Sequence, residues 1–194
     1  MKKIALIALA AGLPLAAQSW ELGLFAGQQS YKSISESGLT GEPKSKTVLA
    51  GRLGYSLVDV GPALFQVNLG FQPKVDTAFQ VNGKDTPVNY QHQYMSVGAM
   101  FNFKAMVAFG VGLDYRMEKV NGTLSGIGDV SYNRPWLRAT AGYAFPTPVV
   151  KPFIGLEVGV PLTSKSYDPN GSTEDAFKAM APKLQIGLYG GIRF

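Results

Sequence analysis

The stretch Ala63-Leu64-Phe65-Gln66-Val67-Asn68-Leu69-Gly70-Phe71-Gln72 alternates between two kinds of residue. Its odd-numbered positions are apolar, and four of the five positions between them are polar or glycine. Because successive side chains of a β-strand point to opposite faces, this period of two gives one apolar face and one polar face. The stretch therefore predicts a β-strand with two different faces.

Seven further segments repeat this alternation along the chain. Their apolar positions fall within residues 22–26, 49–57, 95–103, 105–115, 137–145, 154–160 and 184–194. Eight segments of about ten residues match the strands of a small membrane barrel in number and length. We therefore predict an all-β fold, namely an eight-stranded antiparallel up-and-down transmembrane β-barrel.

The connections between the segments alternate in length. Short connections follow the second, fourth and sixth segments, and longer polar ones follow the first, third, fifth and seventh. The short ones are Val58–Gly61, Asn102–Lys104 and Pro146–Lys151, and the long ones are Ser30–Ser45, Pro73–Asn89, Lys119–Val130 and Thr163–Pro182. Short turns on one rim and long loops on the other are typical of outer-membrane barrels, with both chain ends at the short-turn rim.

Two local signals lie inside the long connections. Ser172–Phe177 has the residue types of a helical turn. Asn82-Gly83 predicts a two-residue hairpin turn that extends the third and fourth strands. A strict two-residue turn would place Phe71 and Tyr94 on the same face, so a bulge near Pro87 or a longer loop is needed.

Three features favour lipid rather than a protein core on the apolar face. Glycine is concentrated on the polar face, as the cramped interior of an eight-stranded barrel requires. Charge is missing from the apolar face within the segments. Aromatic residues of the apolar face gather at the short-turn ends, where they would form a girdle at the membrane interface. The predicted girdle is Trp20, Tyr55, Phe65, Phe101, Phe103, Tyr143 and Phe145. The alternative is a soluble secreted barrel with its apolar face inward.

The polar face carries charged residues that we expect to pair in the lumen, because an isolated buried ion is very costly. The predicted lumen network is Glu21, Arg52, Asp114, Arg116, Glu118, Arg138, Glu157, Lys183 and Arg193. Closure of the last strand on the first would bring Arg193 near Glu21. Asp114, Arg116 and Glu118 share one strand face and could alternatively gate a small conductance or bind a ligand.

Residues 1–19 have the order of a secretory signal peptide, with an early pair of lysines, the apolar run Ile4–Leu15 and small residues after it. The run of about 12 residues is well short of the roughly 20 that a spanning helix needs. We expect cleavage after Ala17 or Ser19, which leaves residues 20–194 as one barrel domain.

The composition excludes several classes of function. The formal net charge of +5 is small and the basic residues are scattered, so nothing points to nucleic acid. The chain has no cysteine and one histidine, which leaves no set of thiolate or imidazole ligands for a metal. We expect a monomer without a cofactor.

The last segment, Leu184-Gln185-Ile186-Gly187-Leu188-Tyr189-Gly190-Gly191-Ile192-Arg193-Phe194, alternates up to a terminal phenylalanine. With this ending, the chain resembles the small outer-membrane β-barrel superfamily that includes OmpA-type and OmpX-type barrels. It departs from the pattern at Tyr189, where a glycine is often found. The resemblance implies location in the cell outer membrane, contact with its lipid and lipopolysaccharide, and recognition of Leu188, Ile192 and Phe194 by the barrel assembly machinery.

Three classes of function remain open. The leading one is a structural or surface-interaction barrel with long extracellular loops, and the alternative is a narrow channel or carrier for small or apolar molecules. A lipid-modifying enzyme would need a serine, a histidine and an acid in contact. Ser96 is about 13 Å from His92 along the strand. We therefore interpret His92 as a solvated residue near the outer rim and expect no catalytic residues.

Overall fold

The computed structural model describes residues 20–122, 129–147 and 149–194, so the predicted signal peptide lies outside the described residues. Within them the chain forms ten strands and one helix. These are β1 (Trp20–Tyr31), β2 (Ile34–Glu36), β3 (Leu39–Pro43), β4 (Lys46–Val60), β5 (Ala63–Val81), β6 (Lys84–Phe103), β7 (Ala108–Gly122), β8 (Val130–Ala144), β9 (Lys151–Pro161), α2 (Thr173–Ala179) and β10 (Pro182–Arg193).

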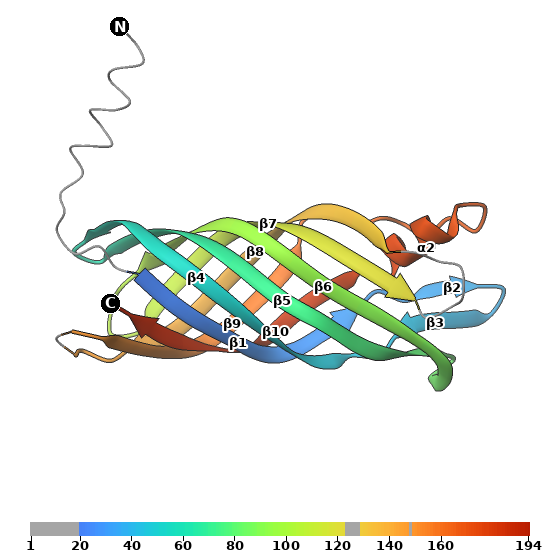
Figure 1. Cartoon of the computed structure of the whole chain (residues 1–194), viewed down its shortest axis with the longest axis horizontal. Helices are drawn as coiled ribbons and strands as arrows, with labels where there is room; N and C mark the ends of the chain where they lie inside the picture. Colours follow the sequence, from blue (N-terminus) through green and yellow to red (C-terminus); the bar gives the residue numbers. More distant parts are fainter. Residues whose placement is uncertain (1–19, 123–128, 148) are drawn as a thin grey trace, which may run out of the picture.

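Eight strands, β1 and β4 to β10, close into an antiparallel barrel (Figure 1). The last strand pairs with the first, with Arg193 opposite Glu21, and the pairing of β5 with β6 completes the ring. The start of β1 and the C-terminus lie at the same end of the barrel, and α2 lies at the other (Figure 1). The predicted eight-stranded antiparallel barrel is therefore confirmed.

The wall of the barrel separates apolar from polar side chains. Outward positions such as Leu24, Leu69 and Leu156 are 58–69% exposed, whereas Gln72 and Arg138 on the inner face are fully buried. A water-soluble protein has the opposite arrangement, and an apolar outer band around a polar interior is typical of a membrane barrel. Within the described residues, no helix is long and apolar enough to cross a membrane.

Inward glycines let neighbouring strands and side chains approach closely. A Cβ atom added at Gly98 would collide with the carboxylate of Asp114, and one at Gly112 would lie 2.6 Å from the carbonyl oxygen of Ala99. The cramped interior that glycine placement predicts is therefore present at these positions.

Two of the predicted long connections are largely strand. The first forms the β2–β3 hairpin, whose β3 pairs with the outer part of β5. In the second, β5 and β6 continue past the barrel as a hairpin that turns at Asn82-Gly83. Both turn residues have positive φ, 50° and 75°, as a hairpin turn of the Asn-Gly type requires.

Two interruptions in the β5–β6 pairing reconcile this turn with the alternation. One lies between Gln72 and Val75, and the other lies between Ala78 and Gln80. The second leaves residues 86–88 unpaired around Pro87, which has no backbone N–H to donate. As a result, Phe71 is exposed on the outer wall while Tyr94 is buried.

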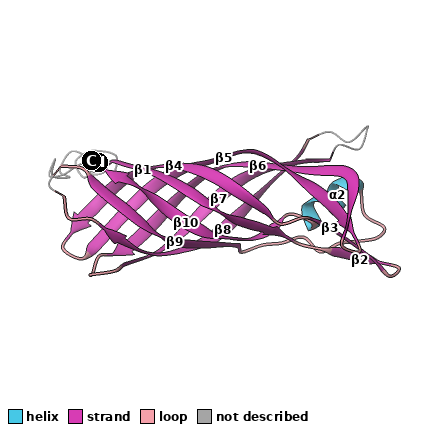
Figure 2. Cartoon of the chain, turned by 90° about the horizontal axis from the view of Figure 1, so that it is seen from below, coloured by secondary structure: helices cyan, strands magenta, loops and turns pink. Residues whose placement is uncertain are grey.

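The helix α2 lies at the long-loop end of the barrel (Figure 2). Ser172 caps it by accepting a hydrogen bond from the backbone N–H of Asp175 at 3.2 Å. Glu174 and Asp175 occupy its first turn, where acidic side chains are favourable to the helix dipole. The helical turn that the sequence indicates is therefore present.

Candidate functional site

The lumen is the candidate site, and its short-turn end is organised around Glu21 of β1. The Glu21 carboxylate accepts hydrogen bonds from Arg193 Nε at 2.7 Å, from Gln66 Nε2 at 3.0 Å and from the Tyr189 hydroxyl. Asn102 donates to the Gln66 carbonyl oxygen at 3.0 Å. These contacts join β1, β5, β6 and β10 across the lumen.

Ion pairs between arginine and carboxylate fill the middle of the lumen. Arg52 binds both carboxylate oxygens of Glu157, at 2.8 and 2.9 Å, in the two-point geometry that guanidinium and carboxylate favour. Arg138, which is fully buried, lies 3.2 Å from Asp114 and 3.7 Å from Glu157. The charges at this level therefore offset each other.

Glu118 of β7 is the centre of the next level. Its carboxylate accepts from Arg134 at 2.7 and 3.1 Å, from Trp136 Nε1 at 2.7 Å, from Tyr132 at 3.1 Å and from His92 Nε2 at 3.0 Å. All of these donors come from β6 and β8, the two neighbours of β7 in the barrel. The carboxylate is thereby fixed by donors from both sides.

A layer of glutamine side chains surrounds the other edge of the His92 ring. The amides of Gln29 and Gln72 both lie 3.1 Å from His92 Nδ1. With both amides donating, Nδ1 is an acceptor and the ring proton is on Nε2, where it reaches Glu118. Gln185 donates to the carbonyl oxygens of Gln29 and Gln72 at 2.6 and 2.8 Å, which closes the layer.

Arg116 is held by aromatic rings rather than by a carboxylate. Its guanidinium lies 4.3 Å from the centre of the Tyr94 ring and 3.9 Å from that of Trp136. It also donates to Gln185 at 2.6 Å. Stacking of this kind stabilises a buried cation, and no ion pair of Arg116 occurs in the part of the chain that the structure describes.

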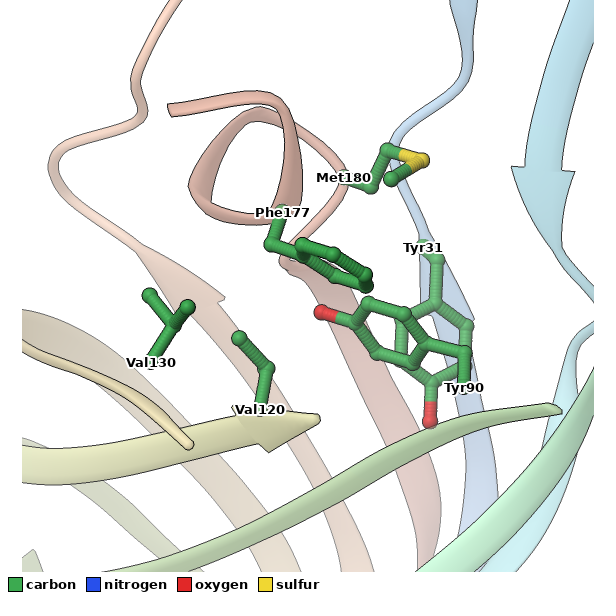
Figure 3. Packing of buried hydrophobic residues seen from close by; sticks show 6 residues of the cluster. All are labelled: Tyr31, Tyr90, Val120, Val130, Phe177 and Met180. Atoms are coloured by element: carbon green, nitrogen blue, oxygen red, sulfur yellow. The ribbon is translucent and has the colours of Figure 1, made fainter. Parts of the chain in front are cut away.

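An apolar cluster closes the lumen at the long-loop end (Figure 3). The closing cluster consists of Tyr31, Tyr90, Val120, Val130, Phe177 and Met180. Phe177 of α2 stacks on Tyr90 with ring centres 6.0 Å apart, and Tyr31 meets Tyr90 edge-on at 5.3 Å. A Cβ atom at Gly122 would collide with the Phe177 ring, so α2 fits directly against the end of β7.

The structure places eight of the nine predicted lumen charges on the inner face, in contact with one another or with lumen side chains. Lys183 is the exception and is exposed. The β1–β10 register shifts between Ser30 and Tyr31, and Lys183 lies at this irregularity without a paired residue. The predicted alternation fails there because an extra residue changes the direction of the side chain.

The interpretation of His92 as a solvated rim residue is wrong. Its ring is fully buried, and both nitrogens have partners. The reason is that the long loops fold over the rim and bury the layer beneath them. Sequence reasoning also missed Arg134 and Trp136, although both continue the even-numbered inward register of Arg138 and could have been found by extending that segment.

The other predicted sites lie on the outer wall. Six of the predicted girdle residues are exposed, namely Trp20, Phe65, Phe101, Phe103, Tyr143 and Phe145. Tyr55 is half-buried, with its ring centre 5.0 Å from that of Trp20. Leu188 and Ile192 on β10 and Phe194 directly after it are exposed. Their roles at the membrane interface and in assembly stay predictions.

Comparison with solved structures identifies the fold. The chain is similar to a major outer membrane protein of Thermus thermophilus, with a TM-score of 0.56 and 15% identity over 90% of this chain and 98% of that one. It is also similar to the outer membrane protein OprG of Pseudomonas aeruginosa, with a TM-score of 0.56 and 11% identity over 92% and 96%. Neisserial surface protein A gives a TM-score of 0.49 at 14% identity over 90% and 95%.

In sequence, no family model and no curated protein matches the chain. The two TM-scores of 0.56 rest on nearly the full length of both partners, so the likeness covers the whole barrel rather than a fragment. The apolar outer wall agrees with it. This chain therefore has the fold of the small outer-membrane β-barrel proteins.

Proposed function

We propose that the chain is an integral outer-membrane barrel with a structural or surface-interaction role and no steady open pore. The observation that carries this proposal is the filled lumen. Buried side chains around Glu21, Arg138 and Glu118 occupy it at successive levels, and Phe177 with Tyr90 closes its outer end. Ions crossing the barrel would have to displace paired charges and aromatic rings at each level.

In this proposal the long-loop end faces the outside of the cell. Among the described residues, the surface presented there includes the β2–β3 hairpin, the extended β5–β6 hairpin and α2. The short-turn end, with its exposed aromatic residues, lies at the periplasmic interface. Assembly through Leu188, Ile192 and Phe194 and contact with lipopolysaccharide are parts of the same proposal.

Conductance of the purified barrel in a planar lipid bilayer tests the absence of a pore. The wild type is expected to give no steady unitary conductance. The double variant Arg52→Ala/Glu157→Ala removes both members of the middle ion pair, so it should raise the conductance above the wild-type baseline. Steady unitary steps from the wild type would contradict the proposal.

A carrier for small apolar molecules is a second candidate, and an apolar groove favours it. The groove has a volume of about 260 Å³ and lies between the β5–β6 hairpin and α2. Phe79, Val88, Tyr90, Phe177 and Met180 line it. The charged lumen beneath the groove opposes passage of an apolar molecule. Binding of an apolar fluorescent probe that Val88→Arg abolishes would show that the groove binds such molecules. A carrier must in addition transport the probe into lipid vesicles.

A lipid-modifying enzyme is the least favoured function. His92 lies below the closing cluster with both ring nitrogens hydrogen-bonded, so a substrate could reach it only after the cluster opened. The His92→Ala variant tests this alternative, because only a wild-type acyl-chain hydrolysis or transfer that this variant loses would favour an enzyme.

A further inference from the structure

Two hollows lie next to each other on the outer wall of the barrel. One, of about 310 Å³, is lined by Met117 and Lys119 of β7 together with Phe71 of β5 and Met95 of β6. The other, of about 600 Å³, extends from Phe71 and Met95 across β4 and β1 to β10. Phe71 and Met95 line both hollows, so the two adjoin each other, and we name them together the wall groove.

The larger hollow exists because two outward positions lack a side chain. Gly51 is paired with Leu24 on one side and with Phe71 on the other, and Leu24 is paired in turn with Gly190. A Cβ atom at Gly51 would meet nothing within 4 Å. The surrounding wall is apolar, with Leu24, Phe71 and Met95 all at least half exposed. An acyl chain is the kind of group that such a hollow accommodates.

The other end of the groove is polar and basic. Gln93 is paired with Lys119, and Lys119 is paired with Ser131. In the interruption between the pairs Gln72–Tyr94 and Val75–His92, Pro73 and Lys74 lie opposite Gln93, so Lys74 flanks the smaller hollow without lining it. Both lysines are exposed, and neither has an ion pair among the described residues.

The carboxylate nearest in sequence on the same face of β5 is already engaged. Asp76 accepts a hydrogen bond at 2.5 Å from Gln91, which lies two residues from Gln93 toward the long-loop end. Asp76 keeps its negative charge two residues from Lys74. Lys74 and Lys119, which have no ion pair among the described residues, still present two ammonium groups at the boundary between apolar wall and polar surface. A phosphate is the anion that membrane lipids place at this boundary, and basic side chains near a membrane surface attract such headgroups.

We propose that the wall groove holds one lipopolysaccharide molecule of the outer leaflet. Its phosphate lies against Lys119 and Lys74, and one acyl chain runs over Phe71 and Met95 into the hollow at Gly51. The order of the groove, basic toward the long loops and apolar toward the middle of the barrel, matches a lipid whose headgroup faces outward. This inference rests on the proposed function, which sets the long-loop end in the outer leaflet.

Lipid retained by the purified barrel tests the groove. The protein is extracted from outer membranes in a mild non-ionic detergent, and native mass spectrometry with fatty-acid and phosphate analysis counts lipid per barrel. The wild type should carry one lipopolysaccharide. Lys74→Ala/Lys119→Ala and, separately, Gly51→Leu should each lower the retained amount by about tenfold. A tenfold loss corresponds to about 1.4 kcal/mol of binding free energy.

Two matched variants control for unrelated effects. Lys84→Ala removes an exposed basic residue of the same hairpin outside the groove, and Ala139→Leu enlarges an exposed outward residue of β8 away from both hollows. Both should retain lipopolysaccharide as the wild type does. A Cβ atom at Gly51 would meet nothing within 4 Å, so Gly51→Leu should still fold, and a gel-mobility shift between unheated and boiled samples verifies that.

Failure of this inference can be told from failure of the proposed function. A folded, non-conducting wild type that carries phospholipid or no lipid would overturn the groove and leave the proposed function standing. Equal retention by the wild type and both groove variants would do the same. A chain recovered outside the outer-membrane fraction would remove both.

Discussion

At the scale of single residues, Glu118 has the largest set of partners in the lumen. Glu118→Gln keeps the shape of the side chain but leaves the guanidinium of Arg134 buried without a counter-charge. Breaking a buried pair in this way costs about 3 kcal/mol. We therefore expect the free energy of unfolding to fall by about that amount, measured by urea unfolding of the barrel in lipid vesicles with tryptophan fluorescence. Asp85→Asn, in an exposed pair with Lys44, should leave the free energy of unfolding close to the wild-type value. Equal unfolding midpoints for Glu118→Gln and the wild type would contradict this account.

At the scale of elements, the tip of the β5–β6 hairpin depends on the charge of Asp85. The Gln80 amide and then the Lys44 ammonium hold the pKa of Asp85 below its ordinary value of 3.8 by hydrogen bonding to the carboxylate. Because the pKa of Asp85 is lower in the folded chain, its contacts with Gln80 and Lys44 stabilise the hairpin fully above pH 3.8. This stabilisation is lost as the pH falls through the pKa of the folded chain. Amide exchange at residues 80–86, corrected for intrinsic rates, should therefore become less protected below about pH 3.8. Unchanged protection, or the same change in Asp85→Asn, would argue against this role.

The helix α2 acts as the lid of the lumen through Phe177. Because the chain has no cysteine, a single one can be introduced at Val130, which is 6% exposed beneath this ring. A water-soluble thiol reagent should label Val130→Cys slowly, and Phe177→Ala should speed the labelling by roughly tenfold or more, since removing a buried phenylalanine ring costs several kcal/mol. Lys84→Cys at the exposed hairpin should label at the same rate with or without Phe177→Ala. Fast labelling of Val130→Cys with Phe177 intact would mean that α2 does not close the barrel.

At the scale of the whole molecule, the period of two predicts most of what the barrel shows. Alternation places Arg52, Asp114 and Glu157 on the inner face because strand geometry is local and regular. It fails at Lys183, where the register shifts. It puts His92 on the inner face, but the burial of His92 depends on loops that fold over the rim, so the interpretation of His92 as solvated is wrong. Neither the register shift at Lys183 nor the burial of His92 can be predicted from the neighbouring residues, since both arise from contacts between segments far apart in the sequence.

The central claim is that the outer wall faces lipid and the lumen is closed to water. Single cysteines along the stretch at residues 63–72 test it most directly, with a water-soluble thiol reagent applied to the barrel in lipid vesicles and a lipid-soluble one applied in parallel. Cysteines at Phe65, Val67 and Leu69 should react with the lipid-soluble reagent only, and those at Gln66 and Asn68 should react with neither. Rapid reaction of the water-soluble reagent at Gln66 and Asn68 would contradict the closed lumen. Rapid reaction of the same reagent at Phe65, Val67 and Leu69 would contradict the lipid-facing wall.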